Sequence, residues 1–232
     1  MLIQIYAFTD PQTAVATVNL GVDNVGFIAG KYGLVHAELT FAEARAIVTA
    51  LPEKGTSTAI SMSEDVDEIL WMAAEVKPDI VHVSTETECV DFGKMRELRS
   101  KLDKNIQLMK AISVEDETSI DVARHYAETS DLLLLDTKIR GFPGVSATGA
   151  THDWKISRRI IEAVYIPVIL AGGLTAENVG EAIRVANPWG VDSNTSTNVP
   201  GSKVDKDLER IKAFVDAVYE YEAAANSEAE KA

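Results

Sequence analysis

Short apolar runs alternate with longer amphipathic segments along the whole chain. Eight of the apolar runs predict strands, at residues 3–8, 24–29, 57–62, 80–84, 106–112, 132–136, 167–172 and 189–193. Most are apolar nearly throughout, as expected of parallel strands that are covered on both faces. The segments between and after them predict helices, at residues 12–20, 40–51, 64–76, 91–103, 116–129, 154–164, 175–186 and 203–224.

Several of the predicted helices carry start signals. Thr40 stands before FAEARAIVTAL with Glu43 three residues later, which is the spacing of a capping box. Ser63 precedes EDVDEIL, which puts acidic side chains in a first turn where they complement the helix dipole. Thr175 precedes AENVGEAIRV. Each signal follows a predicted strand, as expected of a repeated strand–helix unit.

The repeat predicts a barrel. Eight units in 232 residues average about 29 residues each, close to the ~30 of one strand–helix unit. An open doubly wound sheet is the alternative, but it usually has fewer strands and a glycine-rich first turn, where this chain reads AFTDPQ. We therefore predict an α/β fold, a single-domain (β/α)8 TIM barrel over residues 1–222, with residues 223–232 as a fraying or disordered tail.

Charge and cysteine content narrow the functional classes. The formal net charge of −14 disfavours a nucleic-acid partner, because phosphate backbones attract clusters of Lys and Arg. The single cysteine, Cys89, excludes an internal disulfide and favours a reducing compartment. We see no signal peptide and no apolar run near the ~20 residues of a membrane helix. We therefore expect a cytoplasmic protein without a membrane partner.

Two stretches near the carboxyl end of the chain predict a phosphate site. The run VILAGGLTAENV ends a strand in Gly172 and Gly173, which allow close backbone approach, and a helix start follows. The last strand leads into Ser193, Asn194 and Thr195, which offer hydroxyl and amide donors. In barrels of this type the loops after strands seven and eight commonly bind phosphate. Plain turn chemistry is the alternative for each stretch.

Two further strand ends offer acid–base groups. Four leucines precede Asp136, and burial at an apolar barrel rim would raise the pKa of its carboxyl and suit it to general-acid work. In IVHVS, alternation puts His82 and Ser84 on one face, and His82 is a candidate acid or base. A bracing Asp136 and a packed His82 are the structural alternatives.

Other chemistries receive less support. A desolvated Lys110 or Lys138 could form a Schiff base with a carbonyl substrate, although a lysine that braces strand ends is commoner. The four histidines have no close spacing, so we expect neither a metal site nor a cofactor. The loop after residue 136 contains Gly141, Gly144 and Gly149 and is a candidate cover over a substrate.

The segment LLLLDT…ATGATHDW…YIPVILAGGLTAENVGEAIRVANPWGVD…SKVDKDLERIKAFVDAV resembles phosphoribosylanthranilate isomerase, a single-domain barrel of tryptophan biosynthesis. The resemblance continues at lower strength through nearly the whole chain. It implies isomerisation of a phosphorylated ribosylamine to an aminodeoxyribulose phosphate, with one general acid and one general base. Asp136 matches the family's acid, Gly172 and Gly173 match its phosphate-binding glycines, and Asp192 matches the aspartate of its eighth strand.

The chain departs from the family pattern near its amino terminus, at two positions where the family has functional residues. Tyr6 replaces the family's cysteine base in the run Gln4-Ile5-Tyr6-Ala7, and Ala37 lies at or near a carboxylate-binding arginine. Because a phenol of ordinary pKa near 10 is a poor base and alanine cannot pair with a carboxylate, we expect a substrate other than phosphoribosylanthranilate. Tyr6 is then expected to shape the pocket, with Asp192 and Ser84 as further substrate contacts.

Four functions remain open. The leading hypothesis is a sugar-phosphate isomerase, an intramolecular oxidoreductase in which Asp136 acts with His82, Tyr6 or a carboxylate such as Glu38 or Glu86. The second is a genuine phosphoribosylanthranilate isomerase with an unusual base. The third is a Schiff-base aldolase or lyase, and the fourth is a non-catalytic phosphate-ligand binder. We expect a small phosphorylated substrate, and either a monomer or a homodimer.

Overall fold

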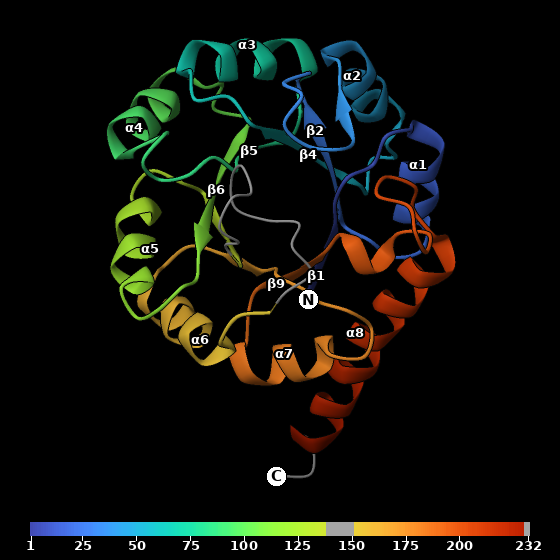
Figure 1. Cartoon of the computed structure of the whole chain (residues 1–232). Coiled ribbons are helices and arrows are strands. Elements are labelled where there is room, and N and C mark those ends of the chain that lie inside the picture. Colours follow the sequence, from blue (N-terminus) through green and yellow to red (C-terminus); the bar gives the residue numbers. More distant parts are fainter. Residues whose placement is uncertain (138–150, 230–232) are drawn as a thin grey trace.

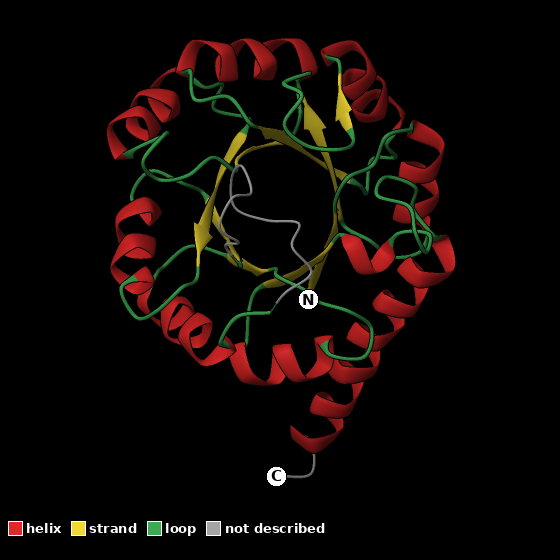
Figure 2. Ribbon diagram, in the orientation of Figure 1, coloured by secondary structure: helices red, strands yellow, loops and turns green. Residues whose placement is uncertain are grey.

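The computed structural model describes residues 1–137 and 151–229, which form a closed ring of parallel strands surrounded by helices (Figures 1 and 2). The strands pair in the order β1-β9-β8-β7-β6-β5-β4-β2, and pairing of β1 with β2 closes the ring. The eight-stranded barrel is therefore confirmed. Its strands are β1 (Leu2–Ile5), β2 (Asn24–Ala29), β4 (Thr56–Ser61), β5 (Ile80–Val83), β6 (Gln107–Ser113), β7 (Leu132–Asp136), β8 (Val168–Leu170) and β9 (Gly190–Ser193).

The helices cover the outer face of the ring. They are α1 (Pro11–Asn19), α2 (Phe41–Ala50), α3 (Val66–Val76), α4 (Phe92–Lys101), α5 (Ser119–Ala127), α6 (Trp154–Ala163), α7 (Val179–Ala186), α8 (Leu208–Ala229) and the short 3-10 helix η1 (Thr195–Thr197). The capping box of α2 is confirmed, because Thr40 and Glu43 exchange side-chain and backbone hydrogen bonds. No helix in these ranges is long and apolar enough to cross a membrane.

Among the differences from the sequence prediction are one extra strand and two later helix starts. A short extra strand, β3 (Glu38–Leu39), pairs parallel with the end of β2. The last helix begins at Leu208 and not at residue 203, because the preceding segment forms a turn in which Ser202 Oγ donates to Asp205. The α7 helix begins at Val179 and not at residue 175, because residues 175–178 form a turn in which the Thr175 N–H donates to the Asn178 side chain.

Side-chain alternation along the strands divides the core into two layers. One set of strand residues packs outward against the helices, including Ile3, Phe27 and Leu133. The other set fills the barrel interior, including Ile60, Met109 and Leu134. Apolar side chains dominate the outer layer and share the interior with polar ones such as Gln4 and Asp192, so most strands read as nearly continuous hydrophobic runs.

At the end of β1 the chain turns sharply over the barrel. Ala7 follows Tyr6 with φ 71°, a left-handed conformation that costs an L-residue roughly 1–2 kcal/mol. The Tyr6 ring fills the space above Gly26 in β2, where an added Cβ would lie 2.1 Å from the ring. Gly26 therefore gives Tyr6 room to lie across the top of the barrel interior.

Aspartates stabilise the opposite end of the barrel. Asp23, Asp79 and Asp131 each stand just before a strand and accept the N–H of a residue on the preceding strand, at 2.7–2.8 Å. Asp131 Oδ2 accepts from Leu108 N and from Arg99 Nη1, both at 2.7 Å. These carboxylates satisfy strand N–H groups that the parallel ladder leaves without partners.

We expect Asp131→Ala to lower the free energy of unfolding by about 1–3 kcal/mol, because the N–H of the buried Leu108 loses its acceptor. Urea denaturation measures the effect. Asp216→Ala is the control, since it removes only an exposed ion pair with Lys212 and should cost less than about 1 kcal/mol. Equal stability of the two variants would contradict this role for Asp131.

Candidate active site

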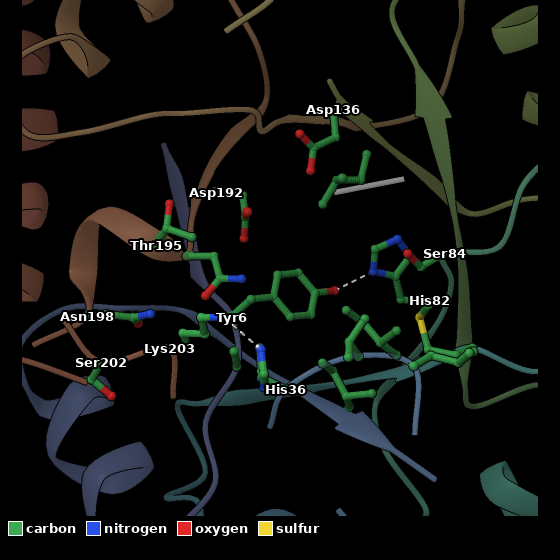
Figure 3. Close-up of a pocket in the computed structure, with 18 of the residues that line it drawn as sticks. Tyr6, His36, His82, Ser84, Asp136, Asp192, Thr195, Asn198, Ser202 and Lys203 are labelled. Carbon is green, nitrogen blue, oxygen red and sulfur yellow. Dashed lines mark hydrogen bonds between the residues drawn. The ribbon is translucent and has the colours of Figure 1, made fainter. Parts of the chain in front are cut away.

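A cavity of about 580 Å³ lies at the carboxyl ends of the strands, where a barrel of this type places its chemistry (Figure 3). Most of the site residues predicted from the sequence line it: Tyr6, His82, Ser84, Asp136, Asp192, Asn194 and Thr195. They come from β1, β5, β7 and β9 and from the loops that follow these strands. Residues distant in the sequence are thus brought round one space by closure of the sheet.

Asp136 ends β7 with its side chain in the barrel interior and only 4% of its surface exposed. Its Oδ1 accepts the N–H of Thr137 at 2.6 Å. Burial raises the pKa of the carboxyl to about 7, although the Thr137 hydrogen bond opposes the shift. A carboxyl with a pKa near neutrality can both donate and accept a proton under physiological conditions.

Asp192 is a second buried carboxyl in the same pocket. Strand register places Asn24, Gln4 and Asp192 side by side on β2, β1 and β9. Asn24 Nδ2 donates to Gln4 Oε1 at 3.2 Å, and Gln4 Nε2 donates to Asp192 Oδ1 at 3.2 Å. Burial and the proximity of Asp136 raise the pKa of Asp192 well above its usual value. Two carboxyls that interact in this way share one proton more readily than they ionise together.

Tyr6 and His82 form a hydrogen bond across the barrel, with 2.6 Å between the phenol oxygen and Nδ1 (Figure 3). Burial, and secondarily the charge of Lys110, lowers the pKa of His82 to about 3, so the imidazole is neutral. Burial and the charge of Asp192 raise the pKa of Tyr6 well above 10. A phenol donating to Nδ1 leaves the proton of the neutral ring on Nε2, which has no hydrogen-bond partner among the described residues. His82 can then serve as a neutral donor.

The predicted phosphate residues divide between the pocket wall and the layer behind it. Asn194 and Thr195 line the cavity, whereas Ser193 Oγ donates to the Leu174 carbonyl at 2.9 Å. Gly172 and Gly173 adopt positive φ values of 86° and 63° and do not line the cavity. A Cβ at Gly172 would lie 3.1 Å from Asp136 Oδ1, so a glycine there allows the chain to pass the carboxyl.

A partly buried lysine, Lys206, holds the loop after β9 in place. Lys206 Nζ donates to the backbone and side-chain oxygens of Asn194, at 2.9 and 3.1 Å, and to Asn198 Oδ1 at 2.7 Å. Burial lowers the pKa of Lys206 to about 7, against the opposing influence of Asp192. The lysine thus fixes the backbone from which Asn194 and Thr195 face the cavity.

Sequence reasoning missed two basic residues of the pocket, His36 and Lys203. They lie in the loops after β2 and β9, and Lys203 Nζ donates to His36 Nε2 at 3.2 Å (Figure 3). The position of Lys203 was a usable signal, because it lies in the loop after the last strand that already carried the predicted phosphate residues. The contact with His36 depends on the three-dimensional approach of two loops and had no signal in the sequence.

Several other candidates do not lie in the cavity. Lys110 projects from β6 into the outer layer, where it donates to the carbonyls of Val83 and Thr85 and lies 5.8 Å from the Tyr126 ring. Its proposed reaction with a carbonyl substrate is therefore wrong on geometric grounds. Glu38 caps the backbone of its own loop, and neither it nor Glu86 lines the cavity. Lys138 and the loop glycines at 141, 144 and 149 lie outside the described residues.

Comparisons with known proteins agree on one family. The family model described as N-(5'-phosphoribosyl)anthranilate (PRA) isomerase matches residues 3–217. An N-(5'-phosphoribosyl)anthranilate isomerase of Haloferax volcanii is 34% identical over 93% of this chain and 91% of that protein. Monomers of the dimeric enzyme of Thermotoga maritima superpose with a TM-score of 0.75 at 26% identity, over 94% of this chain and 97% of theirs.

A further solved structure carries a ligand. It is a phosphoribosyl anthranilate isomerase in complex with reduced 1-(o-carboxyphenylamino)-1-deoxyribulose 5-phosphate. It matches with a TM-score of 0.73 at 25% identity and covers 94% of this chain and 97% of its own. That ligand combines a carboxylate on an aromatic ring with a sugar phosphate.

Asp136→Asn should stabilise the protein at pH 8 and not at pH 4. An unfolded aspartate has a pKa near 3.9, against about 7 in the fold. Below about pH 4 the carboxyl is neutral in both states, and above about pH 7 the folded state must hold a buried charge, so stability falls between these values. The gain at pH 8 is at most on the order of 4 kcal/mol, from a shift of about three units at 1.36 kcal/mol each.

Urea denaturation of the wild type and the Asn variant at both pH values measures this difference. A gain that is the same at pH 4 and pH 8 would show that it does not come from the buried charge.

Proposed function

The chain belongs to the N-(5'-phosphoribosyl)anthranilate isomerase family, and we propose that it catalyses the isomerisation of phosphoribosylanthranilate itself. The observation that carries the proposal is Asp136, a buried carboxyl with a pKa of about 7 in a cavity that also contains Asn194 and Thr195. The sequence departures at Tyr6 and Ala37 led us to expect another substrate. The comparisons do not support that expectation and favour the genuine isomerase.

In the proposed reaction Asp136 donates its proton to the ring oxygen of the ribosylamine, and the ring opens to a protonated imine. Loss of the proton on C2 then gives an enolamine, which becomes the 1-amino-1-deoxy-ketose. We propose that His82, held neutral by burial, donates from Nε2 to a substrate oxygen. A neutral imidazole donor can polarise an oxygen without transferring its proton.

Asn194 and Thr195 are proposed to face the phosphate of the substrate. They start the short helix η1, whose N–H groups and side chains can bind an anion. Lys206 supports this arrangement because it binds the Asn194 carbonyl from behind. It contributes positive charge close to the loop in a chain that is strongly acidic overall.

The carboxylate of the substrate also needs a cationic contact. Ala37 cannot supply it, but Lys203 lines the same cavity and has no carboxylate partner among the described residues. His36 Nε2 accepts from its ammonium group at 3.2 Å, so Nδ1 of the imidazole carries the ring proton and can add a second donor. We assign the anthranilate carboxylate to this pair, which replaces the arginine expected from the family pattern.

A direct assay with phosphoribosylanthranilate tests the proposed function, because the loss of its anthranilate fluorescence reports turnover. Complementation of a tryptophan auxotroph that lacks this isomerase provides the test in cells. We expect turnover by the wild type and restored growth. Asp136→Asn should abolish both. Absence of turnover by a folded wild-type protein would overturn the proposal.

Lys203→Met should raise KM for phosphoribosylanthranilate by roughly tenfold or more and leave kcat nearly unchanged, because a lost charge-assisted contact is worth about 1.5–3 kcal/mol. Steady-state kinetics measure the split. Lys31→Met is the matched control, since this exposed lysine lies on the neighbouring loop and pairs with Glu43. An unchanged KM in Lys203→Met would show that Lys203 does not contact the substrate carboxylate.

A further inference from the structure

The proposed reaction needs a base that removes the proton from C2, and the first strand does not offer an obvious one. Six ionisable side chains line the described part of the cavity: Tyr6, His36, His82, Asp136, Asp192 and Lys203. Asp136 is already engaged as the acid. Among the described residues, the candidates for the base are therefore the other five.

Tyr6 and His82 are unsuited to the task because each engages the other. The phenol oxygen and Nδ1 lie 2.6 Å apart in a buried hydrogen bond, and the Tyr6 ring is held above Gly26. The environment also keeps the phenol protonated and makes the imidazole a very weak base. Together they form a wall and a hydrogen-bond donor.

His36 and Lys203 are also poorly placed. They contact each other in the loops after β2 and β9, and the side chain of His36 is exposed to solvent. Figure 3 shows them away from Asp136, with Tyr6 between in that view. Proton abstraction by either would require the reacting carbon to lie at the rim, away from the acid that opens the ring.

We propose that Asp192 is the general base that removes the C2 proton, in a site where the first strand provides Tyr6 and no thiol. This inference rests on the proposed isomerase function. Asp192 lies in the barrel interior with 6% of its surface exposed, on β9, which is separated from the strand of Asp136 by β8 alone. The substrate carbon atoms can therefore lie between the two carboxyls.

The amide chain beneath the site positions this carboxylate. Asn24 donates to Gln4, and Gln4 donates to Asp192 Oδ1. Among the described contacts this bond holds one carboxylate oxygen of Asp192 and leaves the other to face the cavity. Because the three residues are paired in register on adjacent strands, the chain has little freedom to move. Gln4 thus acts as a positioning residue.

The carboxyl pair also balances the protons of the reaction. In the proposed cycle the pair binds the substrate with its one proton on Asp136 and with Asp192 ionised, a form that the Gln4 hydrogen bond and the charge of Lys206 favour against burial. Asp136 gives its proton to the ring oxygen as the C–O bond breaks, and Asp192 takes the proton from C2 as the enolamine forms. On ketonisation Asp192 gives its proton to C1 and Asp136 takes the proton of the 2-hydroxyl, so the pair regains its starting state without any co-reactant.

Asp192→Asn, Asp192→Glu and the wild type separate catalysis from structure. Asparagine can still accept the hydrogen bond from Gln4 but cannot take a proton, whereas glutamate keeps the base and disturbs the contact. We expect kcat to fall by ~10²–10⁴ in Asp192→Asn, as for loss of a general base, and to fall less in Asp192→Glu. A purely structural role predicts the opposite order.

Two measurements locate the affected step. With substrate deuterated at C2, residual turnover by Asp192→Asn should show a larger isotope effect than the wild type. Calorimetric titration with reduced 1-(o-carboxyphenylamino)-1-deoxyribulose 5-phosphate should show that Asp192→Asn still binds. Asp216→Asn, on the exposed face of α8, is the control and should match the wild type throughout.

The outcomes are distinguishable. If the wild type neither turns over phosphoribosylanthranilate nor binds the reduced analogue, the proposed function fails and the inference fails with it. If the wild type is active and Asp192→Asn keeps kcat within tenfold with an unchanged isotope effect, only the inference is overturned. Should Asp192→Asn not fold, the isotope effect and kcat of Asp192→Glu decide, since displacement of a base slows C–H cleavage and displacement of a structural acceptor does not.

Discussion

Closure of the sheet between β1 and β2 is the constraint on which the rest of the structure depends. Because β1 also pairs with β9, it is the strand that joins the two ends of the sheet. Closure aligns Asn24, Gln4 and Asp192 on three adjacent strands and brings Tyr6 within 2.6 Å of His82. An open sheet with the same strands would leave β1 at an edge and would separate these side chains.

The closed interior is also what makes the polar groups chemically unusual. Burial is the largest cause of the shifted pKa values of Asp136, Asp192, Tyr6 and His82. A buried charge is costly in such surroundings, so the two carboxyls favour a shared proton and the imidazole stays neutral. The site therefore carries an energetic cost in the folded state that supports acid–base chemistry near neutral pH, a common relation between stability and activity.

In the proposed function, other groups take over the roles of those that the family pattern leads one to expect. Tyr6 occupies the position of a base, yet the structure gives it a hydrogen bond and a packing role over Gly26. Ala37 cannot bind a carboxylate, but Lys203 approaches the same cavity from the other end of the chain. When the sequence is compared with the family pattern one position at a time, both changes look like the loss of a functional group. Replacement from a different strand or loop becomes visible only when the whole pocket is present.

The sequence by itself determined the barrel, because hydrophobic periodicity, capping residues and strand–helix spacing are local properties of the chain. It also predicted Asp136, Asn194 and Thr195 as members of one site, since polar residues at the end of an apolar strand stand out from their neighbours, and the three line one cavity. The tertiary structure alone decided that Lys110 faces the helices, that Lys203 meets His36 and that Gln4 holds Asp192. These facts depend on strand register and on the approach of distant loops. Both arise from packing between segments that share no local signal.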